Sequence, residues 1–94
     1  RMVTDAADSP HQLIPTMRGE AYLGFAAHDP YVEDGVIPTL NASMAANQDL
    51  TCEIETHPQT EHGFCFPARP QYRPEPAEIA WRKMTAMYKR VLRA

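Results

Sequence analysis

One stretch limits more than any other what this chain can fold into. The run from Glu20 to Ala27 (EAYLGFAA) is almost entirely apolar and is bounded by turn residues at 18–19 and 28–30. Because apolar and polar residues do not alternate within it, the run predicts a strand covered on both faces, as in a parallel sheet. With 94 residues, the chain is one small domain or part of a larger one.

The remaining elements can be predicted from spacing. Residues 50–56 (LTCEIET) alternate, which is typical of a strand with one solvent-facing side carrying Glu53 and Glu55. A helix over 36–47, capped by Asp34, and a short one over 11–14, ended by Pro15, are predicted from apolar periodicity and start signals.

The clearest element is a helix over 77–93. Its apolar positions recur at helical spacing and predict one core-facing stripe: Ala77, Ala80, Trp81, Met84, Tyr88, Val91 and Leu92. The preceding residues 57–74 hold four prolines and predict a long, functional loop. The order of elements amounts to two successive β–α units, which predicts an α/β fold with two parallel strands and flanking helices.

Composition excludes several classes of protein. The 44% hydrophobic content argues against disorder, no apolar run approaches the roughly 18 residues of a membrane span, and no signal peptide is visible. Two cysteines at 52 and 65 are too few for a disulfide framework and indicate free thiols, so we expect a cytoplasmic protein. The chain opens on Arg1, which suggests that residues are missing upstream.

Charge is distributed unevenly along the chain. Residues 1–68 carry two basic and ten acidic side chains, whereas residues 69–94 carry seven basic and two acidic ones. A basic tail can bind nucleic acid. Here the charges fall on one face of the predicted last helix, which favours a solvated surface.

Two side chains stand out as candidate catalytic groups. Asp29 follows the apolar strand, and His62 lies in the segment Glu61-His62-Gly63-Phe64. A carboxylate and an imidazole at the ends of neighbouring strands are two thirds of a nucleophile–histidine–acid triad. Asp29 could also be a turn residue before proline, and His11 a solvent-facing side chain or a base. None of the 94 residues looks like an activated nucleophile.

Four segments resemble, in the same order, the C-terminal part of dienelactone hydrolase-like proteins. They are TDAADSPH at 4–11, DPYV at 29–32, EHGF at 61–64 and AWR at 80–82. The resemblance covers nearly the whole chain. It implies the C-terminal portion, residues 1–94, of a single α/β-hydrolase domain that cleaves esters or lactones with a Cys or Ser nucleophile, without cofactor or metal.

By this resemblance Asp29 would be the triad acid and His62 the base, in the chain order that the fold uses. The nucleophile elbow, G-x-C-x-G or G-x-S-x-G, would lie upstream of Arg1, so the chain alone should be inactive. We expect it to pack against the missing N-terminal half of the hydrolase or against another copy of itself, because two uncovered strands would expose the apolar run.

The resemblance also indicates where a small ester or lactone substrate would bind. Phe64, Phe66 and Tyr72 would line the pocket. Dienelactone hydrolases place an arginine four residues after the histidine to grip a substrate carboxylate; that position here is Phe66, and Arg69 is the nearest basic side chain. An apolar ester therefore fits the pattern as well as a carboxylated lactone.

Two other interpretations remain open. Cys52, His57, His62 and Cys65 are residue types that bind zinc, which would make a small metal-binding module. Alternatively, the basic C-terminal helix could belong to a non-catalytic interaction domain. The main interpretation requires neither nucleic acid nor a membrane as a partner.

Overall fold

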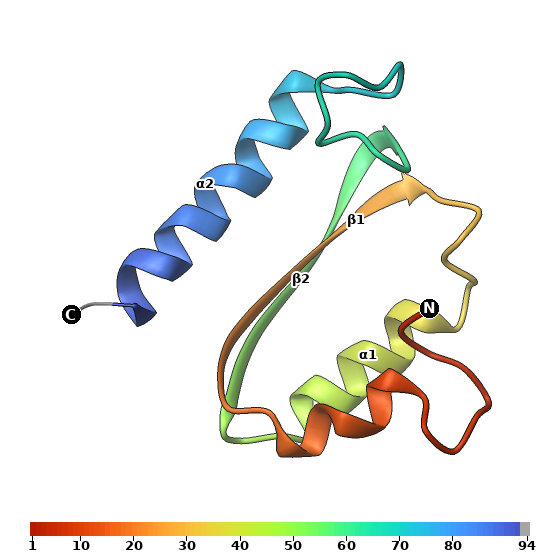
Figure 1. The fold of residues 1–94 in the computed structure, drawn as a ribbon, viewed down its shortest axis with the longest axis vertical. Coiled ribbons are helices and arrows are strands. Elements are labelled where there is room, and N and C mark those ends of the chain that lie inside the picture. Colours follow the sequence, from red (N-terminus) through yellow and green to blue (C-terminus); the bar gives the residue numbers. More distant parts are fainter. Residues whose placement is uncertain (93–94) are drawn as a thin grey trace. The chain divides into compact units, whose positions relative to one another are not determined.

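The computed structural model describes residues 1–92 of the protein. Within this range the chain forms five elements, shown in Figure 1. Their bounds are η1 (Pro10–Thr16), β1 (Gly19–His28), α1 (Val36–Ala45), β2 (Leu50–Glu61) and α2 (Pro74–Val91). The predicted α/β class is confirmed, since β1 and β2 run in the same direction and pair in a two-stranded sheet.

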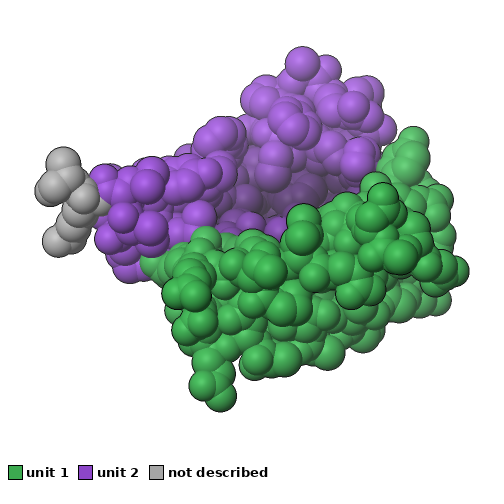
Figure 2. Space-filling model, turned by 60° about the horizontal axis from the view of Figure 1, so that its bottom comes forward, with its two compact units in different colours: residues 1–21, 30–52 green, residues 22–29, 53–94 purple. Residues whose placement is uncertain are grey.

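The residues group into two compact units, coloured separately in Figure 2. The first unit contains residues 1–21 and 30–52, and the second contains residues 22–29 and 53 onward. Each strand therefore begins in the first unit and ends in the second.

The first unit is built on the packing of η1 against α1. Ile14, Leu40, Met44 and Leu50 are its buried apolar side chains. The Asn47 side chain closes this unit by donating hydrogen bonds to the carbonyl groups of Ile14 and Met17, at 2.8 and 2.9 Å.

Three predictions for the first unit were wrong in detail. The first helix is of the 3-10 type and continues through Pro15 to Thr16, because a 3-10 helix does not form the i to i−4 bond that a proline ring blocks in an α-helix. Helix α1 ends at Ala45, before the predicted residue 47. Its N-cap position is occupied by Gly35 without a side-chain cap, so Asp34 does not cap it.

Strand β1 is confirmed within one residue at each end of the predicted run. Ala26 is buried, whereas Tyr22, Leu23 and Phe25 are half-buried. The described residues thus leave part of the apolar run accessible, although its pattern is typical of a strand covered on both faces.

Strand β2 is longer than predicted, and the predicted loop over residues 57–74 is correspondingly shorter. Residues 57–61 continue the strand, although Pro58 interrupts its hydrogen-bonding capacity. Gln59 adopts a positive φ of 57°, which marks a local bulge. The segment is held by side-chain hydrogen bonds, among them one from Arg73 Nη1 to the Gln59 carbonyl at 2.7 Å. Because these two residues are 14 positions apart, the local sequence pattern could not predict this bond. Only residues 62–73 form turns between β2 and α2.

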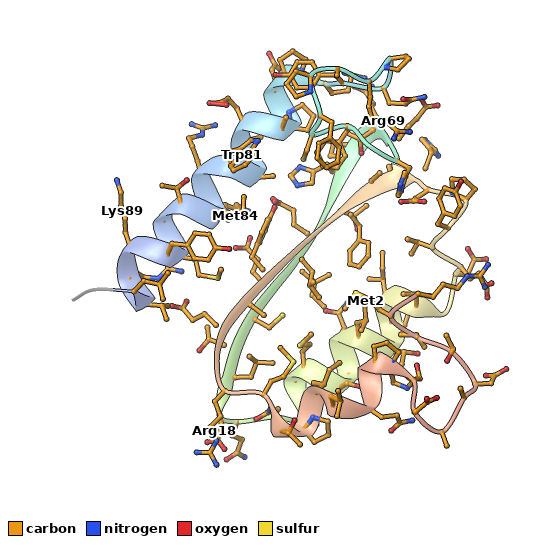
Figure 3. The ribbon with its side chains drawn as sticks, viewed as in Figure 1. Met2, Arg18, Arg69, Trp81, Met84 and Lys89 are labelled. Carbon is orange, nitrogen blue, oxygen red and sulfur yellow. The ribbon has the colours of Figure 1, made fainter. Side chains whose placement is uncertain are left out.

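Helix α2 lies in the second unit. It begins at Pro74, earlier than predicted, and is described to Val91; the predicted end at Arg93 lies outside the described residues. Ala77 and Ala80 are buried, and Met84 lies on the side that faces the strands, whereas Lys89 points away from them (Figure 3).

The predicted core stripe of α2 is wrong for its larger members. Trp81, Tyr88 and Val91 are about half exposed, and Leu92 is exposed more still. The buried positions of α2, Ala77 and Ala80, lie in its first half, whereas the exposed large side chains follow from position 81 onward.

Candidate active site

Asp29 and His62 meet at the carboxyl ends of the two strands. Asp29 directly follows β1, and His62 directly follows β2. Because parallel strands end at the same edge of their sheet, the two side chains come together, with 2.8 Å between His62 Nδ1 and Asp29 Oδ2. Both residues belong to the second unit.

The contact with Asp29 favours one tautomer of the His62 ring. An ionised carboxylate only accepts hydrogen bonds, so Nδ1 of His62 carries the proton and donates it to Asp29. The basic lone pair of a neutral ring is then at Nε2. Asp29 is 10% exposed and the His62 side chain 50% exposed, so the carboxylate is sheltered while the ring is accessible. This arrangement suits a general base that a fixed acid orients.

A tight turn follows the histidine. Gly63 has a φ of +89°, a conformation that residues with a Cβ rarely adopt. A Cβ at this position would also lie 2.6 Å from Nε of Arg69, so the guanidinium lies directly against the glycine. Backbone hydrogen bonds from Phe64 N–H to Glu61 and from Phe66 N–H to Gly63 close the turn.

The four residues predicted to bind substrate occupy different environments. Phe66 and Arg69 are exposed on the turns after His62, where Figure 3 labels Arg69, and Tyr72 is half-buried. Phe64 is buried against the His57 ring, with 5.1 Å between ring centroids, which leaves little of its surface for a ligand. The chain thus places Phe66 and Arg69 on the accessible surface of the turn that carries His62.

A second group of polar side chains was missed by the sequence reasoning. The Tyr22 hydroxyl donates to Glu55 Oε1 at 2.7 Å, and His57 Nε2 lies 3.1 Å from that hydroxyl and 3.2 Å from Oε1. Lys83 of α2 donates to Glu55 Oε2 at 2.7 Å and to Glu53 at 2.5 Å. We call Tyr22, Glu55, His57 and Lys83 the inner cluster.

Electrostatics in the inner cluster are strongly coupled. Burial and the hydrogen bond to the Glu55 carboxylate raise the pKa of Tyr22 far above its usual value. Burial alone would raise the pKa of Glu55, but the hydrogen bonds from Lys83 and Tyr22 outweigh it and hold that pKa below its usual range. Both oxygens of Glu55 are occupied, so the cluster joins α2 to both strands within the second unit.

Alternation along β2 explains why the cluster was missed. Glu55 falls on the face predicted to be solvated, and the pattern cannot indicate that a lysine 28 residues later covers it. For the same reason the charges of α2 do not all lie on a solvated face, because Lys83 points to the strands.

The residues proposed as zinc ligands do not form a metal site. In residues 1–92 no three His, Cys, Asp or Glu side chains gather in a group that could hold a metal ion, and both cysteines are free thiols. Over the same residues, no helix has the length and apolar character to cross a membrane.

Comparisons with known proteins bear on the fold and the family of the chain. The chain is similar in structure to a presumed dienelactone hydrolase from Klebsiella pneumoniae subsp. pneumoniae, with a TM-score of 0.82 and 22% sequence identity. The match covers 95% of this chain and 38% of that one, so the chain spans well under half of its structural relative. A search of curated proteins found no match. The model of the dienelactone hydrolase family matches residues 5–92, and the chain therefore belongs to this family.

Proposed function

We propose that this chain supplies the acid and the histidine of a Cys/Ser–His–Asp triad that hydrolyses ester or lactone bonds of a small molecule. The observation that supports this proposal most directly is the 2.8 Å contact between His62 Nδ1 and Asp29 Oδ2 at the ends of two parallel strands. Membership of the dienelactone hydrolase family supports the reaction class.

Each residue then has a defined role. His62 Nε2 takes the proton of the nucleophile as that group attacks the ester carbonyl, and it returns the proton to the departing alkoxide. Asp29 holds the ring in the Nδ1–H tautomer and stabilises the imidazolium that forms between these two steps. A water molecule, deprotonated by the same Nε2, then releases the acid and regenerates the nucleophile.

The nucleophile and the oxyanion hole lie, in this proposal, outside the 94 residues. The 38% coverage of the Klebsiella structure supports the assignment of the chain as one segment of an α/β-hydrolase domain, and the order of the resembling motifs favours its C-terminal part. Burial raises the pKa of the Cys65 thiol, which is the opposite of what a thiolate nucleophile needs. The segment alone is therefore inactive and functions with the other part of the domain. Two free thiols support a reducing, cytoplasmic location.

Substrate selection falls to the accessible turn residues. Arg69 lies against Gly63, next to His62, and is the side chain best placed to bind a substrate carboxylate. Phe66 and Tyr72 supply apolar surface on the same connection between β2 and α2. Phe64 is buried and contributes by packing against His57, which holds the start of this connection in place.

The test is ester hydrolysis by the hydrolase domain that contains this segment. His62→Ala and Asp29→Asn should each lower kcat by roughly 10³- to 10⁴-fold. The matched control is His28→Ala, because this exposed histidine adjoins Asp29 and has no role in the proposed chemistry. Wild-type rates in either triad variant would contradict the assignment.

A further inference from the structure

The bulge in β2 lies directly upstream of the catalytic histidine. Pro58 cannot donate to a neighbouring strand, and Gln59 turns to a φ of 57°, so the regular ladder between the two strands is interrupted at this point. An interruption here threatens the alignment of the two strand ends that carry Asp29 and His62.

A single hydroxyl group bridges the interruption. Thr60 is 0% exposed, and its Oγ1 donates to the His57 carbonyl at 2.7 Å. The same oxygen accepts the backbone N–H of Ala27 at 3.1 Å. At the start of the sheet the corresponding contact is between backbone groups, Gly19 N–H to Asp49 C=O at 3.2 Å. At its end, a threonine side chain takes the place of the backbone acceptor.

The two bridged positions are equally close to the catalytic pair. Ala27 is two residues before Asp29, and Thr60 is two residues before His62. With the proposed triad as its premise, we propose that Thr60 is a positioning residue that sets the register between the Asp29 and His62 side chains. A slip of about 1 Å between such groups costs on the order of 10²-fold in rate, so a buried bond this near to the pair has a direct effect on catalysis.

Neighbouring contacts hold the bridge in place. Arg73 Nη1 donates to the Gln59 carbonyl at 2.7 Å, which fixes the outer side of the bulge. On its inner side the His57 ring packs against Phe64 and contacts Tyr22. These contacts surround the bulge in the conformation in which the Thr60 hydroxyl accepts from Ala27 of β1.

The experiment compares three variants of the whole chain. Thr60→Val keeps the shape and removes the hydroxyl, Thr60→Ser keeps the hydroxyl, and Thr56→Val is a control at an exposed threonine on the same strand. The readout is the ring ¹⁵N NMR spectrum of His62 at alkaline pH, which reports the ratio of the Nδ1–H to the Nε2–H tautomer. A purely structural role for Thr60 would leave this ratio unchanged in the folded protein.

We expect the tautomer ratio to fall at least threefold in Thr60→Val, which corresponds to roughly 0.7 kcal/mol. In Thr60→Ser and Thr56→Val the ratio should stay within 1.5-fold of wild type, which corresponds to roughly 0.2 kcal/mol. In the complete hydrolase, Thr60→Val should lower kcat by about tenfold at constant KM, and Thr60→Ser should restore it. An unchanged ratio in folded Thr60→Val would overturn the proposal.

Two further measurements keep the outcome decisive. Hydrogen exchange of the Ala27 amide in the wild-type chain must be slow; fast exchange would overturn the proposal even if Thr60→Val fails to fold. Asp29→Asn separates this inference from its premise, since an amide can donate to Nδ1 and reverse the tautomer. If Asp29→Asn leaves the ratio unchanged, the proposed triad fails; if it alone changes the ratio, only the role of Thr60 fails.

Discussion

The second unit contains two histidine–carboxylate pairs, and they differ in which partner is sheltered. In the outer pair the carboxylate of Asp29 is 10% exposed and the ring of His62 is 50% exposed. In the inner pair the ring of His57 is 3% exposed and the carboxylate of Glu55 is 27% exposed. The outer ring is accessible, as the proposed role of His62 requires, whereas the inner one is enclosed by Tyr22 and Phe64. The same two functional groups thus form one pair that solvent and ligands can reach and one pair that is part of the packed interior.

The largest expected contrast comes from removing each histidine in turn. His57→Ala should lower the free energy of unfolding by about 2–4 kcal/mol, because it leaves a cavity beside Phe64 and removes a partner of Glu55. His62→Ala should change that free energy by less than about 1 kcal/mol, because its pair is partly solvated. Urea unfolding of both variants measures the difference. Equal losses would show that the two pairs do not differ in role.

A smaller effect is expected at the turn of the outer pair. Gly63→Ala should lower the free energy of unfolding by about 1–3 kcal/mol, because the new Cβ must adopt a positive φ and displace Arg69. Gly35→Ala is the matched control, since nothing lies within 4 Å of its added Cβ and its φ of −81° is ordinary. If both alanines are tolerated equally, the contact between Gly63 and Arg69 is not fixed in solution.

The smallest effect is the pH dependence of the inner cluster. The folded-state pKa of Glu55 is lowered, so its stabilisation is present above the ordinary value of 4.5 and is lost as the pH falls below it. The pKa of Tyr22 is raised, so its contribution is lost as the pH climbs above the ordinary value of 10.0. Unfolding free energies between pH 3 and 11 should therefore decline at both ends.

Two substitutions test which group causes each decline in the unfolding free energy. Glu55→Gln should flatten the acid decline, and Tyr22→Phe should flatten the alkaline one. Glu61→Gln and Tyr88→Phe, at exposed positions, should leave both declines as in the wild type. Profiles that stay unchanged in Glu55→Gln and Tyr22→Phe would mean that other groups govern the pH dependence.

The periodicity of apolar residues predicted best the elements whose burial it reflects directly. The continuous run of β1 and the start of β2 were predicted well, because side-chain period reports burial directly. The pairing of Asp29 with His62 could also be predicted from the sequence, since parallel strands end at the same edge of their sheet. The continuation of β2 past Pro58 was not, because it depends on Thr60 and Arg73, whose partners are distant in sequence.

The inner cluster also could not be predicted from local sequence patterns. Glu55 obeys the alternation of β2, yet Lys83 and Tyr22 cover it from other elements. On α2 the period correctly indicated a helix but not which part of its apolar stripe is buried, because spacing gives the face of a helix and not how far along it the contact extends.

The position of Trp81 provides an optical signal. It is the only tryptophan of the chain and is 53% exposed, so in this structure its fluorescence is that of a largely hydrated indole. If a partner covers this side of α2, the emission should shift to shorter wavelength as water leaves the ring. Trp81 is therefore a native spectroscopic probe that can report, without a label, whether a partner covers this side of α2.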